Sequence, residues 1–567
     1  MDNPVLTLDH YKYIRPDIEE FEKEFLALLK DFKNSCSFEE QKNCFLKLLD
    51  LRNHFDTMST LAHIRHTLNV TDKFYDSENN YFDEVSPKYV SFITKYYYEI
   101  LNSKYREELE KEYGSQLFKL AEINLKTFSP EVLEDLKVEN KLVSKYVKLL
   151  ASAKISYKNE ERNLSQMASF YQNKDRSVRK EAQEVVTEFF VKHEEELDKI
   201  YDDLVKVRDK IAKKLGFENF IELGYARMGR SDYGSEEVKV FRKQILEIVT
   251  PLVKELIKKQ AKRLNLESIK YYDQPLYFLE GNAKLKGSPQ DIVSSGEQMY
   301  TELSSETEEF FKFMKNRELF DLVARKNKVG REYMTYLVDY KSPFILSNFN
   351  GTLSDVFVLT HEMGHAFQAY CCKDEKIEEY LAPTLESCEI HSMSMELITW
   401  PWMNLFFEED KKYKFIHLAS SLRILPYIAV VDEFQHWVYE NPQATPFERK
   451  KFWRETEKKY QPHKDYEDND FLNRGGFWFR QSHIFKAPFY YIDYALAQIC
   501  AFQFWNKFEE DRKKAWENYL SLCKVGGKKS FLDLLKTVEL LNPFEEGTIS
   551  SAVDPVKKWL DDFDFSK

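Results

Sequence analysis

Two histidines and a glutamate in the middle of the chain have the types and the spacing of a metal-dependent hydrolase. The segment His361-Glu362-Met363-Gly364-His365 has the pattern H-E-x-x-H. On a helix, residues four apart lie on one face, so both imidazoles could reach one metal ion. Glu362 is displaced around the helix, where its carboxylate could face a metal-bound water without ligating the metal. The pattern therefore predicts a zinc site with His361 and His365 as ligands and Glu362 as the general base.

The residues around this pattern indicate a buried helix. Residues 350–354 read as a turn that ends in hydroxyl side chains suited to a helix start. The residues that follow, up to 370, are apolar around most of the helix circumference, which implies burial. Histidines on a buried helix must be paired or must bind something. This weakens the alternative that the two histidines lie on the solvated face of an amphipathic helix.

A third protein ligand is expected from a second helix, which we predict over residues 383–397. This segment is rich in Leu, Met, Ile and Cys, yet it holds Glu386, Glu389 and Glu396. Glu386 falls in the first turn, where the helix dipole already favours an acid. Glu389 and Glu396 share a face, and carboxylates inside an apolar helix need a cation or hydrogen-bond donors. We therefore predict Glu389 as the third zinc ligand and Glu396 as a partner that orients a ligating histidine.

The two zinc segments resemble the oligoendopeptidase F branch of the thimet-oligopeptidase-like metallopeptidases, and the Pz-peptidase-like members most closely. The resemblance is carried by residues 361–368 and 389–396, with support from residues 64–72, 230–233, 343–352 and 434–439. It implies a zinc-dependent endopeptidase that holds one Zn²⁺ ion and hydrolyses short oligopeptides. It also implies a large two-lobed helical fold with the metal deep in a substrate channel.

A second group of residues, near the C-terminus, could stabilise negative charge. Gly475 and Gly476 precede His483 and a tyrosine-dense segment, which suggests a loop that can move relative to rigid helices. By the resemblance, His483 and Tyr494 match a histidine and a tyrosine that hydrogen-bond the carbonyl oxygen as it becomes an oxyanion. The tetrahedral intermediate carries a negative charge, which correctly oriented hydrogen-bond donors stabilise.

The same segment departs from the thimet-like pattern at one place. Ala487 and Pro488 stand where thimet-like members have a Gly-Tyr pair. Either Tyr490 or Tyr491 could replace the missing tyrosine, so both are candidate catalytic residues. The alternative is that these tyrosines form an aromatic stripe in the core with solvated hydroxyls.

One short β region is predicted immediately before the zinc helix. Residues 329–340 alternate at period two, and a second run follows at residues 344–349, so the pair predicts a hairpin. An edge strand there could pair with an extended substrate backbone. Alternatively, the hairpin could serve only to anchor the zinc helix.

The rest of the chain is predicted to be helical, so the fold class is mainly α with a small β-sheet next to the zinc helix. The 567 residues include only 16 Gly and 17 Pro, and segments such as 178–215 and 236–264 carry helical spacing. No Pro/Gly/Ser-rich linker divides the chain. We predict an N-terminal helical lobe over residues 1–193 and a catalytic lobe over residues 194–567.

The N-terminal sequence and the cysteines predict a cytoplasmic protein. The first ten residues lack the basic and apolar regions of a signal peptide, and no 18 apolar residues run together, so no membrane span is expected. Seven cysteines without C-x-x-C spacing favour buried thiols over disulfides. The net charge of −12 argues against nucleic-acid or anionic-membrane binding. The sequence does not predict an oligomeric state.

Two further functions belong to other classes. One is a zinc carboxypeptidase or dipeptidyl-carboxypeptidase of similar helical architecture, which also uses H-E-x-x-H. Residues 389–396 and 490–494 match the endopeptidase branch better. The other is a non-catalytic peptide-binding scaffold with a fossil site, and the presence of ligands, base and oxyanion donors speaks against it.

Overall fold

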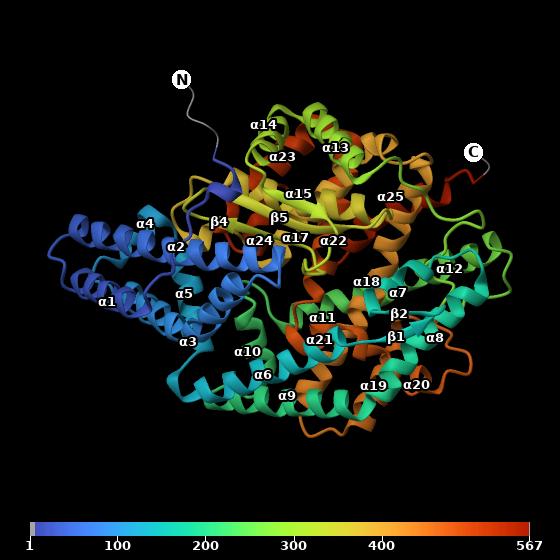
Figure 1. Cartoon of the computed structure of the whole chain (residues 1–567), viewed down its shortest axis with the longest axis horizontal. Helices are drawn as coiled ribbons and strands as arrows, with labels where there is room; N and C mark the ends of the chain where they lie inside the picture. The colour runs from blue at the N-terminus through green and yellow to red at the C-terminus, as the bar shows by residue number, and fades with distance from the viewer. Residues whose placement is uncertain (1–5, 566–567) are drawn as a thin grey trace. The chain divides into compact units, whose positions relative to one another are not determined.

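The computed structural model describes residues 6–565, which are mainly α-helical with two small β-sheets (Figure 1). The predicted fold class, a mainly helical protein with a small sheet next to the H-E-x-x-H helix, is confirmed. The long helices predicted over residues 178–215 and 236–264 are present, each interrupted once. The first divides at His193 into α8 (Arg176–Lys192) and α9 (Glu194–Lys214), and the second contains a π-helical turn at Ile245–Val249.

The described residues form two compact units, each built from three separate stretches of chain. Unit 1 comprises the described residues up to Phe128, Lys284–Asp410 and Phe504–Leu540; unit 2 comprises Ser129–Ala283, Lys411–Gln503 and the described residues from Leu541 onward. The lobe boundary expected after residue 193 does not coincide with this division, because it falls inside unit 2. There α9 packs against α6 (Leu133–Ala151), which precedes it in the chain, so the two helices stay in one body.

In unit 1 the N-terminal helices pack on one another through a regular apolar stripe. Along α1 (Ile18–Asn34) the buried residues recur every three or four positions, as in Phe21, Phe25 and Leu29. This face contacts α2 (Phe38–Leu68) and α3 (Lys73–Leu101), drawn in blue in Figure 1. The remaining helices of unit 1 are α4 (Arg106–Tyr113), α5 (Gln116–Thr127), α13 (Pro289–Leu303), α14 (Ser305–Asn316), α15 (Ser354–Cys371), α16 (Glu378–Leu381), α17 (Leu385–Ile398), α23 (Arg512–Val525) and α24 (Phe531–Thr537).

A three-stranded sheet in unit 1 precedes α15. Its order is β3 (Phe320–Val323), β5 (Ser342–Phe349) and β4 (Tyr333–Leu337). β4 and β5 are antiparallel and form the predicted hairpin, whereas β3 pairs with β5 in parallel and was not predicted. The central strand β5 is buried along almost its whole length, and the sheet packs against α15. The sheet therefore anchors the helix that carries the histidines.

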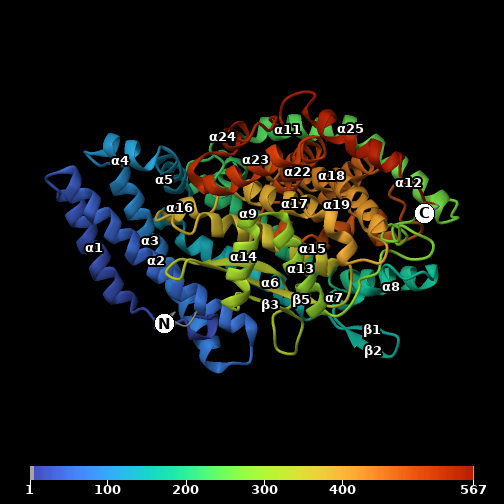
Figure 2. The same cartoon turned by 90° about the horizontal axis from the view of Figure 1, so that it is seen from above.

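Unit 2 is also helical and carries the second, two-stranded sheet. β1 (Ile155–Tyr157) and β2 (Glu160–Arg162) form a small antiparallel hairpin that lies beside α8 (Figure 2). The other helices of unit 2 are α7 (Leu164–Met167), α10 (Phe220–Arg227), α11 (Ser235–Gln244), α12 (Thr250–Arg263), nearly all of α18 (Asp410–Glu440), α19 (Pro446–Tyr460), α20 (Asp470–Asn473), α21 (Ser482–Lys486), most of α22 (Ile492–Glu510), and α25 (Thr548–Asp561).

Among residues 6–565, one helix, α18, is long and apolar enough by composition to cross a membrane. Within its most apolar window 83% of the residues are buried inside the structure. Its interior also carries charge, because Asp432 pairs with Arg242 and with His436. Burial of this kind is what the core helix of a large helical body shows.

Candidate metal centre

The helix that carries the H-E-x-x-H pattern is fixed at its start by its own aspartate. Asn350 and Gly351 turn the chain out of β5, and both backbone N–H groups donate to the carboxylate of Asp355, at 3.0 and 2.8 Å. Gly351 has φ +82°, which favours glycine. The expected hydroxyl cap is wrong, because the residue before the helix is Leu353 and makes no side-chain cap. Asp355 reaches back and satisfies the turn amides instead.

His361 and His365 lie one turn apart on α15 and meet Glu389 from α17. His361 Nε2 lies 3.3 Å from Glu389 Oε2, and His365 Nε2 lies 3.6 Å from the same oxygen. One ligand atom from each of the three residues lies within 4.8 Å of the others. Two imidazoles and one carboxylate are a common ligand set for zinc in hydrolases.

The protonation of this cluster favours a bound cation. His361 Nδ1 donates to Glu396 Oε1 at 2.7 Å, so the Nε2 of a neutral ring turns a lone pair toward Glu389. Burial disfavours the imidazolium, yet the hydrogen bonds to Glu389 and Glu396 outweigh it and raise the pKa of His361 well above its usual value. Burial lowers the pKa of His365 to about 4, which keeps that ring neutral. The two carboxylates thus favour a positive charge at His361, which a metal ion on Nε2 would supply in place of the proton.

Glu362 is nearly buried and lies outside the three-ligand cluster. Burial raises the pKa of its carboxyl to about 7, although the nearby His361 opposes the shift. A carboxyl group with a pKa near neutrality is suited to exchange protons with a bound water.

Burial alone does not distinguish the acids of α17. Glu386 is fully buried, as deeply as Glu389, and accepts a hydrogen bond from Thr384 Oγ1 at 2.8 Å. Its position in the first turn of α17 therefore does not leave it exposed. The difference lies in direction, because Glu389 joins the histidine cluster and Glu386 is not part of it.

The glycine inside the pattern lets the two ligand helices touch. A Cβ added to Gly364 would lie 2.7 Å from Ser392 Cα and 2.8 Å from the carbonyl oxygen of His391, both backbone atoms of α17. The same carbonyl accepts a hydrogen bond from Tyr519 Oη at 2.8 Å, so α23 braces this contact. Sequence reasoning missed Tyr519, since nothing local links α23 to α17. His391 itself is buried, and burial lowers its pKa to about 4.

Gly364→Ala is expected to separate α15 from α17 and to weaken metal binding. A methyl group cannot fit against two backbone atoms, so the substitution should cost about 1–3 kcal/mol of stability. The histidines would retreat from Glu389, and zinc affinity should fall by about 10- to 100-fold. The melting temperature and a competitive zinc titration measure both effects. Gly330→Ala is the matched control, because its Cβ would meet nothing within 4 Å; equal behaviour of the two variants would contradict the close-contact role.

In unit 2 the structure brings together the four residues expected to act on an oxyanion. The ring of His483, on α21, lies 5.5 Å from that of Tyr490, 4.9 Å from Tyr491 and 5.8 Å from Tyr494, measured between centroids. Tyr494 Oη donates to Tyr490 Oη at 3.1 Å. All four side chains are half-buried. We call His483, Tyr490, Tyr491 and Tyr494 the donor cluster.

Gln481 sets the tautomer of His483, and sequence reasoning missed it. Gln481 Nε2 lies 2.7 Å from His483 Nδ1, and an amide nitrogen can only donate, so Nδ1 accepts. The proton of the neutral ring then lies on Nε2, which makes Nε2 the donor atom of this side chain. Tyr427 Oη donates to Gln481 Oε1 at 3.0 Å and holds the amide in this orientation. A carboxamide two residues before the histidine was the only sequence signal.

The glycine pair before this cluster serves close packing. Gly475 has φ +96°, and its Cβ would lie 2.0 Å from the Lys450 carbonyl oxygen. A Cβ on Gly476 would lie 2.3 Å from the Phe471 ring. In place of the expected loop, both glycines are wedged against neighbouring elements and the following residues, Gly476–Arg480, form a 3-10 helix.

A strained residue leads into the tyrosines. Phe489 has φ +67°, which costs an aromatic residue about 1–3 kcal/mol. Arg230 holds this conformation, because its Nη2 donates to the Phe489 carbonyl at 2.6 Å and to Asp493 at 2.6 Å. The Phe489 ring packs so closely on Gly224 that a Cβ there would lie 2.5 Å away. Asp493 is thus paired with an arginine and supports the backbone of the donor cluster.

Comparison with known proteins gives consistent matches along the chain. Residues 8–128 match the Peptidase M3 N-terminal domain, and residues 169–553 match Peptidase family M3. The chain is 24% identical over 382 residues to an oligoendopeptidase F homolog of Borreliella burgdorferi, covering 65% of this chain and 62% of that protein. It is 22% identical over 357 residues to the oligopeptidase PepF of Bacillus subtilis, covering 61% and 46%.

A solved structure matches over almost the full length. The chain is 51% identical to Pz peptidase A with an inhibitor, with a TM-score of 0.95 over 98% of this chain and 100% of that chain. By contrast, the chain spans less than two thirds of the length of the two curated relatives named above. The resemblance to oligoendopeptidase F and Pz peptidase noted in the sequence is confirmed by these matches.

Proposed function

The chain belongs to peptidase family M3, and we propose that it is a zinc-dependent endopeptidase that hydrolyses short oligopeptides. The observation that carries the proposal is the convergence of His361, His365 and Glu389 beside Glu362. These three ligands would hold one Zn²⁺ ion. A bound zinc ion supplies a Lewis acid that acidifies water and polarises a carbonyl group.

The residues of the chain have distinct roles in this proposal. Glu362 takes a proton from the attacking water and later delivers it to the leaving amine. Glu396 holds His361 through its Nδ1 and so fixes the tautomer that turns Nε2 toward the ligand cluster. Removal of Glu362 would therefore impair proton transfer, whereas removal of Glu396 would lower the affinity for the metal.

We assign the stabilisation of the oxyanion to the donor cluster. The Nε2–H of His483 and the hydroxyl group of Tyr490 can donate to a developing negative charge. Tyr494 Oη donates to Tyr490 Oη and so supports that donor, or turns its own O–H toward the charge instead. Tyr491 is the weaker candidate, because its ring packs on that of Tyr427, 6.0 Å away between centroids. We also propose that the edge strand β4 pairs with an extended peptide. In the three-stranded sheet β4 pairs with β5 along one edge, so its other edge is not paired within the sheet.

Product mapping on a mixed peptide library by mass spectrometry tests the reaction type. We expect internal cleavage of short peptides, including peptides that are blocked at both ends, because an endopeptidase needs neither terminus. A carboxypeptidase or dipeptidyl-carboxypeptidase would stall on an amidated C-terminus. Release of only C-terminal residues, or cleavage of a folded protein in preference to short peptides, would contradict the proposal.

Location and partners remain proposals as well. None of the seven cysteines forms a disulfide bond in the described residues, which agrees with a reducing compartment and the predicted cytoplasmic location. Oligopeptides are the expected partners. The net charge of −12 supports the prediction that the protein binds neither nucleic acid nor anionic membranes.

A further inference from the structure

Unit 2 contains a lysine whose charge is surrounded by aromatic rings. Lys464 Nζ lies 4.3 Å from the ring centroid of Phe477 and 5.9 Å from those of Tyr427 and Tyr466. Lys464 is half-buried. Within residues 6–565 no carboxylate oxygen forms an ion pair with this ammonium group.

A second cation shares the same ring. The Cζ atom of Arg480 lies 5.3 Å from the centroid of Phe477. Its two Nη atoms donate to neutral oxygens, Gln183 Oε1 at 2.9 Å and Thr187 Oγ1 at 2.7 Å. Like Lys464, Arg480 has no acidic partner in the described part of the chain. Two cations therefore flank one aromatic side chain without a counterion.

The acid that acts most strongly on the charge of Lys464, Glu457, is already paired. Glu457 accepts from Arg454 Nη1 at 2.8 Å and from Tyr466 Oη at 2.5 Å, and it is fully buried. Arg423 adds a further positive charge, and its Nη1 donates to the Gln274 carbonyl oxygen at 2.8 Å. Four cations, Lys464, Arg480, Arg423 and Arg454, are thus gathered around one carboxylate, that of Glu457.

Burial and mutual repulsion both act on the lysine. Burial lowers the pKa of Lys464 to about 8, and the charges of Arg423 and Arg480 push it in the same direction while Glu457 opposes them. Buried charges are normally paired, and contact with aromatic faces replaces only part of the lost hydration. A bound anion would complete this site.

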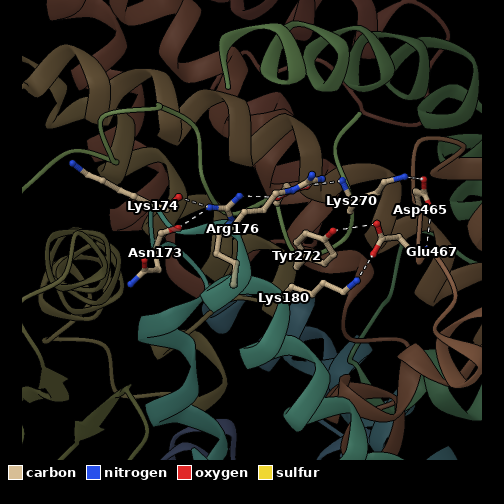
Figure 3. Close-up of polar contacts among 10 residues, drawn as sticks. Asn173, Lys174, Arg176, Lys180, Lys270, Tyr272, Asp465 and Glu467 are labelled. Atoms are coloured by element: carbon tan, nitrogen blue, oxygen red, sulfur yellow. Dashed lines mark hydrogen bonds and ion pairs between the residues drawn. The ribbon is translucent and has the colours of Figure 1, made fainter. Parts of the chain in front are cut away.

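The loop directly after Lys464 is held by contacts of Asp465 and Glu467 (Figure 3). Lys270 Nζ lies 2.5 Å from Asp465, and Lys180 Nζ lies 3.0 Å from Glu467. Tyr272 Oη also donates to Glu467 at 3.2 Å. A loop held by these contacts presents Lys464 in a fixed position, as a binding site requires.

Tyr427 connects the cations to the donor cluster. Its ring centroid lies 5.9 Å from Lys464 Nζ and 6.0 Å from the ring of Tyr491, and its hydroxyl group donates to Gln481. Lys464 and the donor cluster are therefore separated by no more than about three or four residues of extended peptide, at about 3.3 Å per residue.

We propose that Lys464 and Arg480 form a subsite that binds a carboxylate of the peptide substrate, a few residues from the bond that is cleaved. This inference rests on the proposed peptidase function and adds a substrate preference to it. The carboxylate can be the C-terminal one or that of an acidic side chain. Either would supply the missing counterion and favour short peptides with a negative charge near the scissile bond.

Peptide binding to an inactive enzyme tests the subsite without turnover. In a Glu362→Gln background, an acetylated oligopeptide with a free C-terminus is compared by calorimetry with its C-terminal amide. A third peptide, amidated and with Glu in place of Gln near its end, reports on side-chain carboxylates. We expect a carboxylate to lower Kd by about 10-fold, as a partly desolvated ion pair does. The peptide that binds more tightly than the amide shows whether the subsite takes the C-terminal carboxylate or that of a side chain.

The ratio of the Kd of the amidated peptide to that of the peptide with a carboxylate should fall to about one when Lys464→Gln is added. Lys464→Arg should retain most of this ratio. Lys458→Gln is the matched control, because Lys458 lies exposed on α19 and forms no ion pair in the described residues; it should leave the ratio at about 10. Lys464→Gln should not lower the melting temperature, since it removes a repelling charge.

Equal Kd values for all three peptides, or a ratio that survives Lys464→Gln, would overturn the inference. Failure of the wild-type enzyme to cleave any peptide would instead contradict the proposed function, and the binding ratio would remain measurable.

Discussion

Glu362→Gln is expected to retain its metal and to lose about 100- to 10,000-fold in kcat, the usual contribution of a positioned general base. Glutamine has the same shape but cannot accept a proton from water. Because Glu362 lies outside the ligand cluster, zinc content should stay near that of the wild type. Turnover of a fluorogenic oligopeptide and metal analysis of the same preparation measure the two quantities.

A matched control separates the base from a general effect of charge. Glu517 is an exposed glutamate of the same unit without an ion pair in the described residues, so Glu517→Gln should behave as wild type. Loss of zinc in Glu362→Gln would make Glu362 a ligand, and near-normal turnover would remove it from the mechanism.

His483→Ala and Tyr494→Phe are expected to lose about 100- to 1,000-fold in kcat with little change in peptide binding. Donors to an oxyanion act mainly after charge has developed on the carbonyl oxygen, so the ground state should be affected little. Tyr490→Phe should show a similar loss, because its hydroxyl group pairs with that of Tyr494. Tyr491→Phe should lose less. Steady-state kinetics together with Kd values for an uncleaved peptide separate the two effects.

Two outcomes would change the assignment. If His483→Ala lowers zinc occupancy, His483 is a metal ligand and the site must be redrawn. If all four variants keep full kcat, the donor cluster is only an aromatic core, and the metal with backbone amides must stabilise the oxyanion alone.

The local parts of the candidate site could be predicted because they depend on short-range periodicity. The spacing of His361 and His365 and the apolar surroundings of α15 indicate a buried helix with two aligned imidazoles. The hairpin of β4 and β5 follows from alternation in the same way. For Glu389 the prediction relied on burial, and the structure shows that Glu386 is equally buried. The two glutamates differ only in the direction of their side chains, because only that of Glu389 joins the histidines. The sequence pattern does not give this direction.

The remaining features depend on contacts between distant segments. Tyr519 braces the carbonyl of His391 across more than a hundred residues, and β3 joins β5 in parallel from the other side of the hairpin. The two units are each assembled from three stretches, so no composition change marks their limits. The glycines at 475 and 476 indicated flexibility, whereas their actual requirement is the approach of Lys450 and Phe471. The sequence pattern does not show which distant residue packs against a glycine.

Zinc per chain in Glu389→Ala and Glu386→Ala, measured with turnover of a peptide blocked at both ends, tests the central claim most directly. Both acids are buried on α17, but only Glu389 joins His361 and His365. We expect Glu389→Ala to lose zinc and turnover together, and Glu386→Ala to keep close to one zinc per chain. Equal zinc loss in both variants, loss in Glu386→Ala alone, or turnover by Glu389→Ala without metal would contradict the account.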